Sequence, residues 1–380
     1  MTLRPDAMAM RAGELPAVSD DTRHRVARNE TAGRVLIVGN FLHSATGTFG
    51  VCEGLAAELA AAGWDVVTTS GRPRRVARLA DMLTTIWRER GRYAVAQVDV
   101  YSGSAFYWAE ASCWLLRRIG RPYILTLHGG ALPEFAARHP ERVTRLLNSA
   151  AAVTTPSGYL VEALSRYRRN LILQPNPIAA AQYPFRVRRA PEPRLLWVRA
   201  FHRIYNPVMA VRVVASLQHD YPGVRLTMVG PDRGDGTREK TLAAAAELGV
   251  ETRVAFPGAV AKSRLPEVFA EHDIFLNTTN VDNTPVTVVE AMACGMSVIS
   301  TSVGGVPYLV RHEEDALLVE PDDADGMSAA VRRVMNTPDL AEKLSLGARQ
   351  NALSRDWSIL LPRWERLLND VAAGREGGMD

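Results

Sequence analysis

Short apolar runs alternate with longer amphipathic stretches along most of the chain. In the first half, each apolar run ends in a polar or glycine-bearing loop. The runs are Arg34–Val38, Asp65–Thr69, residues 94–100, Tyr123–Leu127 and Ala152–Thr155. Between them, apolar residues recur at helical spacing, as at Val51, Leu55 and Leu59. This alternation predicts a parallel α/β sheet built from right-handed βαβ units.

The pattern breaks once and then starts again. Residues 186–194 are rich in proline and arginine and lack an apolar period, which predicts a linker. A second series of apolar runs follows, at Leu195–Val198, Arg225–Val229, Arg253–Phe256, Ile274–Asn277 and Ser297–Ser300. Helical patterns separate these runs. The fold class predicted is therefore α/β, with two doubly wound Rossmann-like domains facing across a cleft.

Domain bounds follow from these patterns. Residues 1–32 carry charges of both signs without an apolar core, which predicts a disordered tail rather than a targeting segment. The first domain is expected over 33–188 and the second over 189–356. Residues 357–380 hold an amphipathic helix and a tail, and we expect this helix to cross back to the first domain.

Composition narrows the functional classes. The net charge of +4 over 380 residues is too small to indicate nucleic-acid binding. No apolar run approaches the roughly 20 residues that span a bilayer. The three cysteines lie far apart in apolar surroundings, which predicts buried thiols and a cytoplasmic location. Lysine occurs only three times, so arginine must supply most of any phosphate clamp.

Candidate chemistry concentrates between Asp282 and Pro307. Asp282 and Glu290 are eight residues apart, and Gly304 and Gly305 follow. A helix is expected to start here, with Thr284 as its N-cap and Pro285 as its first residue. Asn283, Thr284, Pro285 and Val286 are the residues expected to face the donor. Carboxylates suit hydroxyl groups, whereas helix amides and glycine turns suit phosphates, so a nucleotide-sugar fits. The alternative is that Asp282 is a turn residue and Glu290 a solvated helix residue.

Three further features lie after predicted strands. Arg199 and Arg203 are four residues apart on one loop and could both reach a diphosphate, or they are surface arginines beside the linker. His128 ends a strand, where it either touches a ligand or is structural. The loop before the first helix, which contains Gly47, is a candidate anion loop.

Several other chemistries are not indicated. Residues 230–236 are glycine-rich but lack the lysine of a phosphate-binding loop. No His/Cys cluster has zinc spacing. Asp323 and Asp325 match the metal-binding sequence motif D-x-D. They lie at the start of a predicted helix, however, where acidic residues are favourable for the helix dipole. We therefore expect no metal and no cofactor beyond a nucleoside-diphosphate sugar as co-substrate.

These residues resemble the family 4 glycosyltransferases, which have the GT-B fold and retain anomeric configuration. The resemblance covers about residues 34–372 and is strongest in Glu290–Ile299 and the glycine pair; it is supported by Leu125–Gly130, Ser157, residues 176–178 and Gly258. It implies that the transfer needs no metal. It also implies that Glu290 holds the nucleotide ribose, Asp282 and His128 face the donor sugar, and Arg199 binds the diphosphate. Gly47 matches one of the two glycines of the first-domain loop.

Three positions depart from the family pattern. Asp282 replaces a glutamate, and Thr46 replaces the other loop glycine. Ile204 and Tyr205 stand where a clamp lysine usually follows the arginine, so Arg203 is hypothesised to substitute for it.

The resemblance implies a metal-independent hexosyltransferase of polysaccharide or glycoconjugate biosynthesis. It would move a hexose from a nucleoside-diphosphate sugar to a hydroxyl of a glycan, a lipid-linked acceptor or a small molecule. The first domain would then lie on the acceptor side, and the second would bind the nucleotide-sugar. Alternatives are a nucleotide-sugar epimerase of the same fold or a non-catalytic nucleotide-sugar-binding subunit. Residues 72–92 combine arginines with apolar residues, which is typical of a helix on an anionic membrane and equally of a helix packed on the sheet. The alternative location is thus peripheral, on the inner face of the cell membrane.

Overall fold

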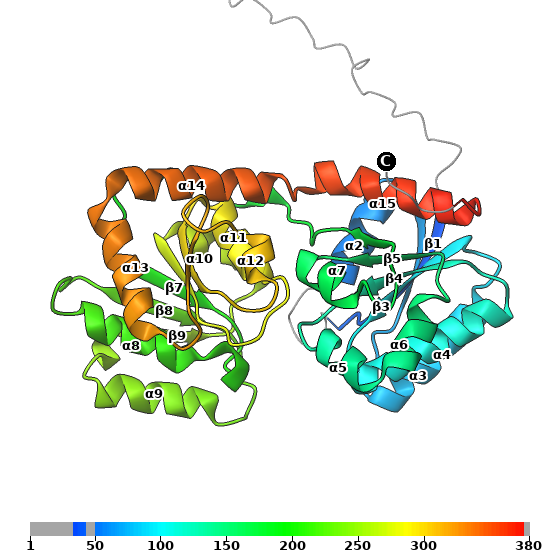
Figure 1. Cartoon of the computed structure of the whole chain (residues 1–380), viewed down its shortest axis with the longest axis horizontal. Helices are drawn as coiled ribbons and strands as arrows, with labels where there is room; N and C mark the ends of the chain where they lie inside the picture. The colour runs from blue at the N-terminus through cyan, green and yellow to red at the C-terminus, as the bar shows by residue number, and fades with distance from the viewer. Residues whose placement is uncertain (1–32, 43–49, 376–380) are drawn as a thin grey trace, which may run out of the picture. The chain divides into compact units, whose positions relative to one another are not determined.

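The computed structural model describes residues 33–42 and 50–375, which form two α/β domains (Figure 1). The first sheet is parallel, in the order β2-β1-β3-β4-β5-β6. Its strands are β1 Arg34–Val38, β2 Asp65–Thr69, β3 Val95–Val100, β4 Tyr123–Leu127, β5 Ala152–Thr155 and β6 Leu171–Leu173. Its helices are α2 Val51–Ala61, α3 Arg75–Arg88, α4 Ser104–Arg118, α5 Leu132–Arg138, α6 Pro140–Leu147 and α7 Gly158–Leu164.

The second sheet is also parallel, in the order β12-β11-β10-β7-β8-β9. Its strands are β7 Arg194–Val198, β8 Arg225–Val229, β9 Val254–Gly258, β10 Ile274–Asn277, β11 Ser297–Thr301 and β12 Leu317–Val319. Its helices are α8 Pro207–Leu217, α9 Thr237–Glu247, α10 Leu265–Ala270, α11 Val286–Ala293, α12 Val306–Leu309, α13 Ala324–Asn336 and α14 Pro338–Leu353. The 3-10 turns η2 Ala180–Gln182, η3 Arg203–Tyr205, η4 Glu251–Arg253 and η5 Lys262–Arg264 connect them. The prediction of two doubly wound, Rossmann-like α/β domains is thus confirmed.

Both faces of each sheet are buried, because the strands carry near-continuous apolar runs. On the first sheet, α3 and α4 pack against one face, and Leu36, Val98 and Leu125 lie in that core. The other face is covered by α2 and by α15 (Trp357–Ala372), as Figure 1 shows. On the second sheet, α8 and α13 cover one face and α11 and α14 the other.

The C-terminal helix α15 belongs to the first domain by packing. Its residues Trp364 and Leu368 lie in one core cluster with Val35 and Ile37 of β1. The indole of Trp64 donates a hydrogen bond of 2.9 Å to Glu365 of this helix. None of the described helices is long and apolar enough to cross a bilayer.

The arginine-rich segment before β7 forms no helix or strand, but its arginines are not simply solvated. Asp273 is almost fully buried and accepts hydrogen bonds or ion pairs from Arg186, Arg188 and Arg194. Arg188 is itself buried, and burial lowers its pKa to about 10. The segment is therefore fixed to the second domain by a buried carboxylate that follows α10.

Candidate functional site

The candidate residues lie at the carboxyl ends of the strands, where open α/β sheets bind ligands. His128 follows β4, Arg199 follows β7 and Asp282 lies after β10. A cavity of about 320 Å³ is present at this edge. Its lining comes from both domains: Ser102, His128, Gly129, Gly130, Ala131, Pro156, Asn176, Ile204, Tyr205, Val281, Asp282, Asn283 and Thr284. The cavity brings together His128, Asp282, Asn283 and Thr284 of the predicted set.

Arg199 and Asp282 form a largely buried ion pair. Nη2 of Arg199 contacts Oδ2 of Asp282, and the two side chains are 16% and 13% exposed. Oδ1 of Asp282 accepts a hydrogen bond of 2.8 Å from the backbone amide of Asn283. Nε of Arg199 is buried and makes no hydrogen bond within the described residues. Arg199 does not itself line the cavity, but its guanidinium contacts two residues that do, Asp282 and Tyr205, and it keeps one donor without a partner. An unpartnered donor on a cation next to the cavity wall is favourable for binding an anion.

Helix α11 starts beside this ion pair without a side-chain cap. Its N-cap is Pro285 and its first residue is Val286, so the expectation that Thr284 caps the helix is wrong. The hydroxyls of Thr284 and Thr287 are buried and have no hydrogen-bond partner within the described residues. Free amides in the first turn and unpartnered hydroxyls together favour a negatively charged ligand.

Glu290 is buried within the second domain and does not line the cavity. The phenol of Tyr183 donates a hydrogen bond of 2.8 Å to its Oε1. Burial raises the pKa of Glu290, whereas the Lys262 charge, the Tyr183 hydrogen bond and the Arg199 charge oppose that rise. The alternative that Glu290 is a solvated helix residue is therefore wrong, because its side chain is buried. No sequence pattern identified Tyr183 or Lys262, because both are distant along the chain.

Glu290→Gln is expected to remove one component of the pH dependence of stability. Because the fold raises the pKa of Glu290 above its ordinary 4.5, the native state binds more protons than the unfolded chain above that pH. The free energy of unfolding therefore falls as pH rises from 4.5 through the raised pKa. Denaturant titrations across this range measure the slope. The same slope in the wild type and in the neutral glutamine variant would contradict this assignment.

The glycine pair after β11 allows two backbone segments to meet. A Cβ added to Gly304 would overlap the carbonyl oxygen of Asp282, and one added to Gly305 would overlap that of Asn283. Gly305 also donates a backbone hydrogen bond of 3.1 Å to Asp282, and Gly304 has a φ of 52°. The pair thus fixes the position of Asp282. A direct donor contact by Gly304 or Gly305 stays a prediction.

The Asn283 side chain is held by the first domain. Its Oδ1 accepts a hydrogen bond from the hydroxyl of Ser157, which also caps α7 through the Leu160 amide at 3.3 Å. The same hydroxyl thus fixes the start of one helix and one wall residue of the cavity. Asn283 reaches the cavity already oriented by this contact.

His128 is buried at the end of β4 and is tied to the neighbouring strand. Its Nε2 lies 3.0 Å from Oδ1 of Asp99 on β3. Its ring stacks on Tyr101, with 5.0 Å between ring centroids. Sequence reasoning missed Asp99, although its position at the end of a buried apolar strand was a usable signal.

Arg203, predicted to bind the diphosphate, is not brought to the cavity. The exposed Arg203 lies in η3, and its backbone amide donates to Asp235 at 3.1 Å. The next two residues, Ile204 and Tyr205, line the cavity instead, and the Arg199 guanidinium lies 4.9 Å from the Tyr205 ring centroid. The structure thus gives no support to Arg203 as a substitute for the clamp lysine. Gly47 lies outside the described residues.

Comparisons with known proteins found similarity to glycosyltransferases. Residues 183–351 match the family model of glycosyl transferases group 1. The chain is 30% identical over 195 residues to D-inositol 3-phosphate glycosyltransferase from Mycobacterium ulcerans, covering 49% of this chain and 41% of that protein. It is 26% identical over 322 residues to the protein of the same name from Thermobispora bispora, covering 75% and 74%. The chain therefore spans about two fifths of the first of these relatives.

Solved structures show the same fold. Sucrose-phosphate synthase from Thermosynechococcus elongatus has a TM-score of 0.74 and 19% identity, covering 90% of this chain and all of that one. The Anabaena protein HepE, in complex with UDP, has a TM-score of 0.70 and 17% identity, covering 89% of this chain and all of that one. HepE has also been solved with UDP-glucose, at a TM-score of 0.66 and 17% identity, covering 87% of this chain and 99% of that one. At these identities the likeness shows the fold.

Proposed function

We propose that the chain is a glycosyltransferase of family 4, moving a hexose from a nucleoside-diphosphate sugar to an acceptor hydroxyl with retention at the anomeric carbon. One observation carries the proposal: the Arg199 guanidinium and the uncapped start of α11 offer unused donors beside a cavity walled by both domains. The match to glycosyl transferases group 1 and the UDP complexes of HepE support a nucleotide-sugar donor.

The proposed chemistry follows from charge. Breaking the bond between the anomeric carbon and the phosphate oxygen leaves negative charge on the diphosphate and positive charge on the sugar. The Arg199 guanidinium and the first amides of α11 stabilise the leaving diphosphate. Losing one such donor raises the activation barrier by about 3–4 kcal/mol. Asp282 already accepts from Arg199 and from the Asn283 amide, so it is placed for binding rather than for nucleophilic attack.

No metal is needed in this proposal, because the cationic and amide groups supply the positive charge. We also propose a cytoplasmic location, which the three free, buried cysteines support. The expected result is turnover that persists in excess EDTA, and recovery of the protein in the soluble fraction of lysed cells. Loss of activity in EDTA that added divalent ions restore would contradict the metal-free proposal.

A donor screen tests the function directly. A UDP- or GDP-sugar that binds is expected to raise the thermal midpoint, because a ligand at 100 times its Kd stabilises the native state by about 2.7 kcal/mol. The same donor with polyol and sugar acceptors should give a transferred hexose of retained configuration, seen by NMR. Conversion of the donor to an isomeric sugar nucleotide would instead identify an epimerase. Binding without turnover on any acceptor would identify a binding subunit.

Peripheral contact with an anionic membrane is a separate proposal. In α3, Met82 and Ile86 pack in the core, and Arg78 is buried, donating to Asn40 and two backbone carbonyls. Arg78, one of the arginines of the 72–92 segment, therefore cannot belong to a membrane-facing surface. Trp87 is 51% exposed with Arg90 4.4 Å from its ring centroid, which is a suitable group for a membrane interface.

Salt-sensitive flotation with vesicles containing an anionic phospholipid is the expected result if this contact forms. Trp87→Ala should weaken it, since the exposed indole then no longer enters the interface. Trp114→Ala on α4, an equally exposed tryptophan with Arg118 beside it, shows whether the surface extends to that helix. No flotation at low salt would exclude the membrane contact.

A further inference from the structure

Asp99 is a buried carboxylate for which the described structure provides no cationic lysine or arginine partner. Its side chain is 3% exposed, and its ion-pair contact is with His128. Oδ1 accepts from Gln97 at 2.8 Å and lies 3.0 Å from Nε2 of His128. Oδ2 is buried without a hydrogen bond of good geometry. Another deeply buried carboxylate, Asp273, differs in having three arginines around it.

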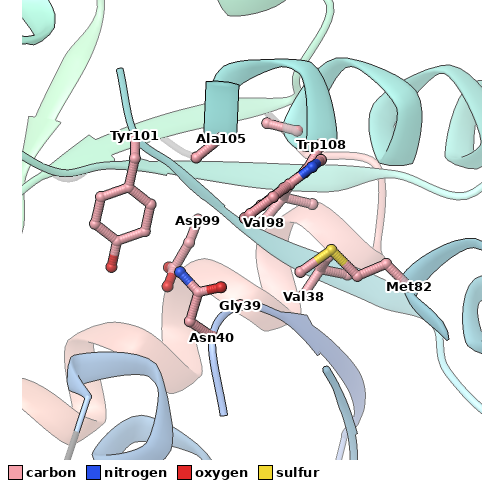
Figure 2. Close-up of a pocket in the computed structure, with 10 residues that line it drawn as sticks. Val38, Gly39, Asn40, Met82, Val98, Asp99, Tyr101, Ala105 and Trp108 are labelled. Carbon is pink, nitrogen blue, oxygen red and sulfur yellow. The ribbon is translucent and has the colours of Figure 1, made fainter. Parts of the chain in front are cut away.

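The second oxygen of Asp99 is confined rather than solvated. A Cβ at Gly39 would stand 2.9 Å from Oδ2 and 2.8 Å from the Cys52 sulfur, so both groups crowd this glycine. Burial, and next the Asp99 charge, raise the pKa of the Cys52 thiol, which therefore stays protonated and is a weak donor. Figure 2 shows the Asp99 carboxylate between the side chains of Tyr101 and Asn40, beside a cavity of about 10 Å³.

Such a group is unfavourable for the fold alone. A buried carboxylate loses several kcal/mol of hydration, and an apolar residue of similar volume is often neutral or stabilising in its place. The hydrogen bonds of Gln97 continue to Thr126 at 2.8 Å, and Thr154 reaches Thr126 at 3.0 Å. Gln97 thus contacts the same Oδ1 that faces His128, and Thr126 and Thr154 hold Gln97 in place. Its remaining directed contact is the histidine that lines the cavity.

The contact decides which ring nitrogen of His128 carries the proton. An ionised carboxylate only accepts, so Nε2 facing Asp99 must be the N–H. Nδ1 then has a free lone pair, and it makes no hydrogen bond with any described residue. Stacking on Tyr101 prevents the ring from turning freely.

We propose that Asp99 is a positioning residue that holds His128 in the Nε2–H tautomer, so that Nδ1 accepts a hydrogen bond from a ligand hydroxyl in the cavity. The hydroxyl belongs to the donor sugar or to the acceptor, and this part of the inference rests on the proposed function. The assignment of the tautomer does not rest on the proposed function, because the tautomer is a property of the protein without ligand.

Nitrogen-15 NMR of the histidine rings in the full chain tests the tautomer, with His128→Gln identifying the resonances. The wild type should show a protonated Nε2 and an unprotonated Nδ1. Asp99→Asn should keep this pattern, since Gln97 donates to the same oxygen and directs the amide oxygen toward His128. Asp99→Leu should give a mixture of tautomers, whereas the control Thr154→Val, at the far end of the chain of contacts, should not. A wild-type Nδ1–H tautomer, or no change in Asp99→Leu, would overturn the proposal.

Steady-state kinetics then test the role of Asp99 and show whether the hydroxyl belongs to the donor sugar or to the acceptor. Asp99→Leu should lower kcat/KM about 10- to 100-fold, as removal of carboxylates that orient histidines does elsewhere, without a lower thermal midpoint. A raised KM for the donor, with equal loss of donor hydrolysis, assigns the hydroxyl to the sugar; a raised KM for the acceptor alone assigns it to the acceptor. Lower stability with unchanged kcat/KM would mean that Asp99 is structural. If no donor is turned over, the proposed function is wrong, but the NMR experiment still tests the tautomer of His128 independently.

Discussion

Replacing Arg199 by alanine should lower kcat/KM for transfer by about 100- to 1,000-fold, the effect of losing one preorganised donor at a developing charge. The guanidinium is held in place by Asp282 and lies over Tyr205, so it is ordered before any ligand binds. Its unpartnered Nε makes a hydrogen bond available without breaking another. Steady-state kinetics with the donor found by screening measure the loss. Arg199→Lys should rescue little of it, because an ammonium cannot replace the planar fork.

A second variant distinguishes the loss of the Arg199 guanidinium from the effect of leaving Asp282 without its ion-pair partner. Arg199→Ala leaves the Asp282 carboxylate largely buried without its cation, which is itself unfavourable. In the double variant Arg199→Ala/Asp282→Asn that penalty is absent. If Arg199 acts on the diphosphate, activity stays low in the double variant; recovery to near the wild-type value would contradict its role. Arg212→Ala, at an exposed arginine of α8, is the matched control.

Gly305→Ala should destabilise the protein by roughly 3 kcal/mol, the upper part of the usual range for overpacking. The added Cβ would overlap the carbonyl oxygen of Asn283, and backbone atoms cannot move aside as a flexible side chain does. The Gly305 amide also donates to Asp282, so a displaced backbone should lower activity as well. Denaturant titration gives the free energy of unfolding, and donor turnover reports the site.

The same substitution at Gly54 should act in the opposite direction. Gly54 lies inside α2, where an added Cβ meets only the Trp357 ring at 3.4 Å. Alanine in a helix interior is favoured over glycine by about 0.5–1 kcal/mol. Equal stability changes in Gly305→Ala and Gly54→Ala would show that crowding against Asn283 is not the cause.

The sequence predicted the alternation of strands and helices well because buried parallel strands are continuous apolar runs. It did not predict the strands β6 and β12 or the helices α5, α7, α12 and α14. β6 and β12 have three residues each, too few for a period, and they are strands because they pair with β5 and β11. α14 begins at Pro338, and its Leu344 and Ala348 are buried by packing against the second sheet and its helices.

The residues of the candidate site were also only partly predictable from the sequence. Asp282, Arg199 and His128 were found in the sequence because each follows a strand, and parallel strands end at one edge of their sheet. Their partners were not found. Tyr183 reaches Glu290 across 107 positions of sequence, and Asp99 reaches His128 across 29. Hydrogen bonds over such separations leave no local pattern.

By itself, the sequence determined the two α/β domains, the edge at which polar residues gather and the resemblance to a glycosyltransferase, since periodicity and short motifs are local properties. Only the tertiary structure decided what each polar group faces. It paired Arg199 with Asp282 and turned Arg78 inward. It also set Gly304 and Gly305 against the backbone of the 282–283 loop and placed Asp99 behind His128. These contacts depend on how separate elements pack, because burial and direction are set by neighbours that are distant in the chain.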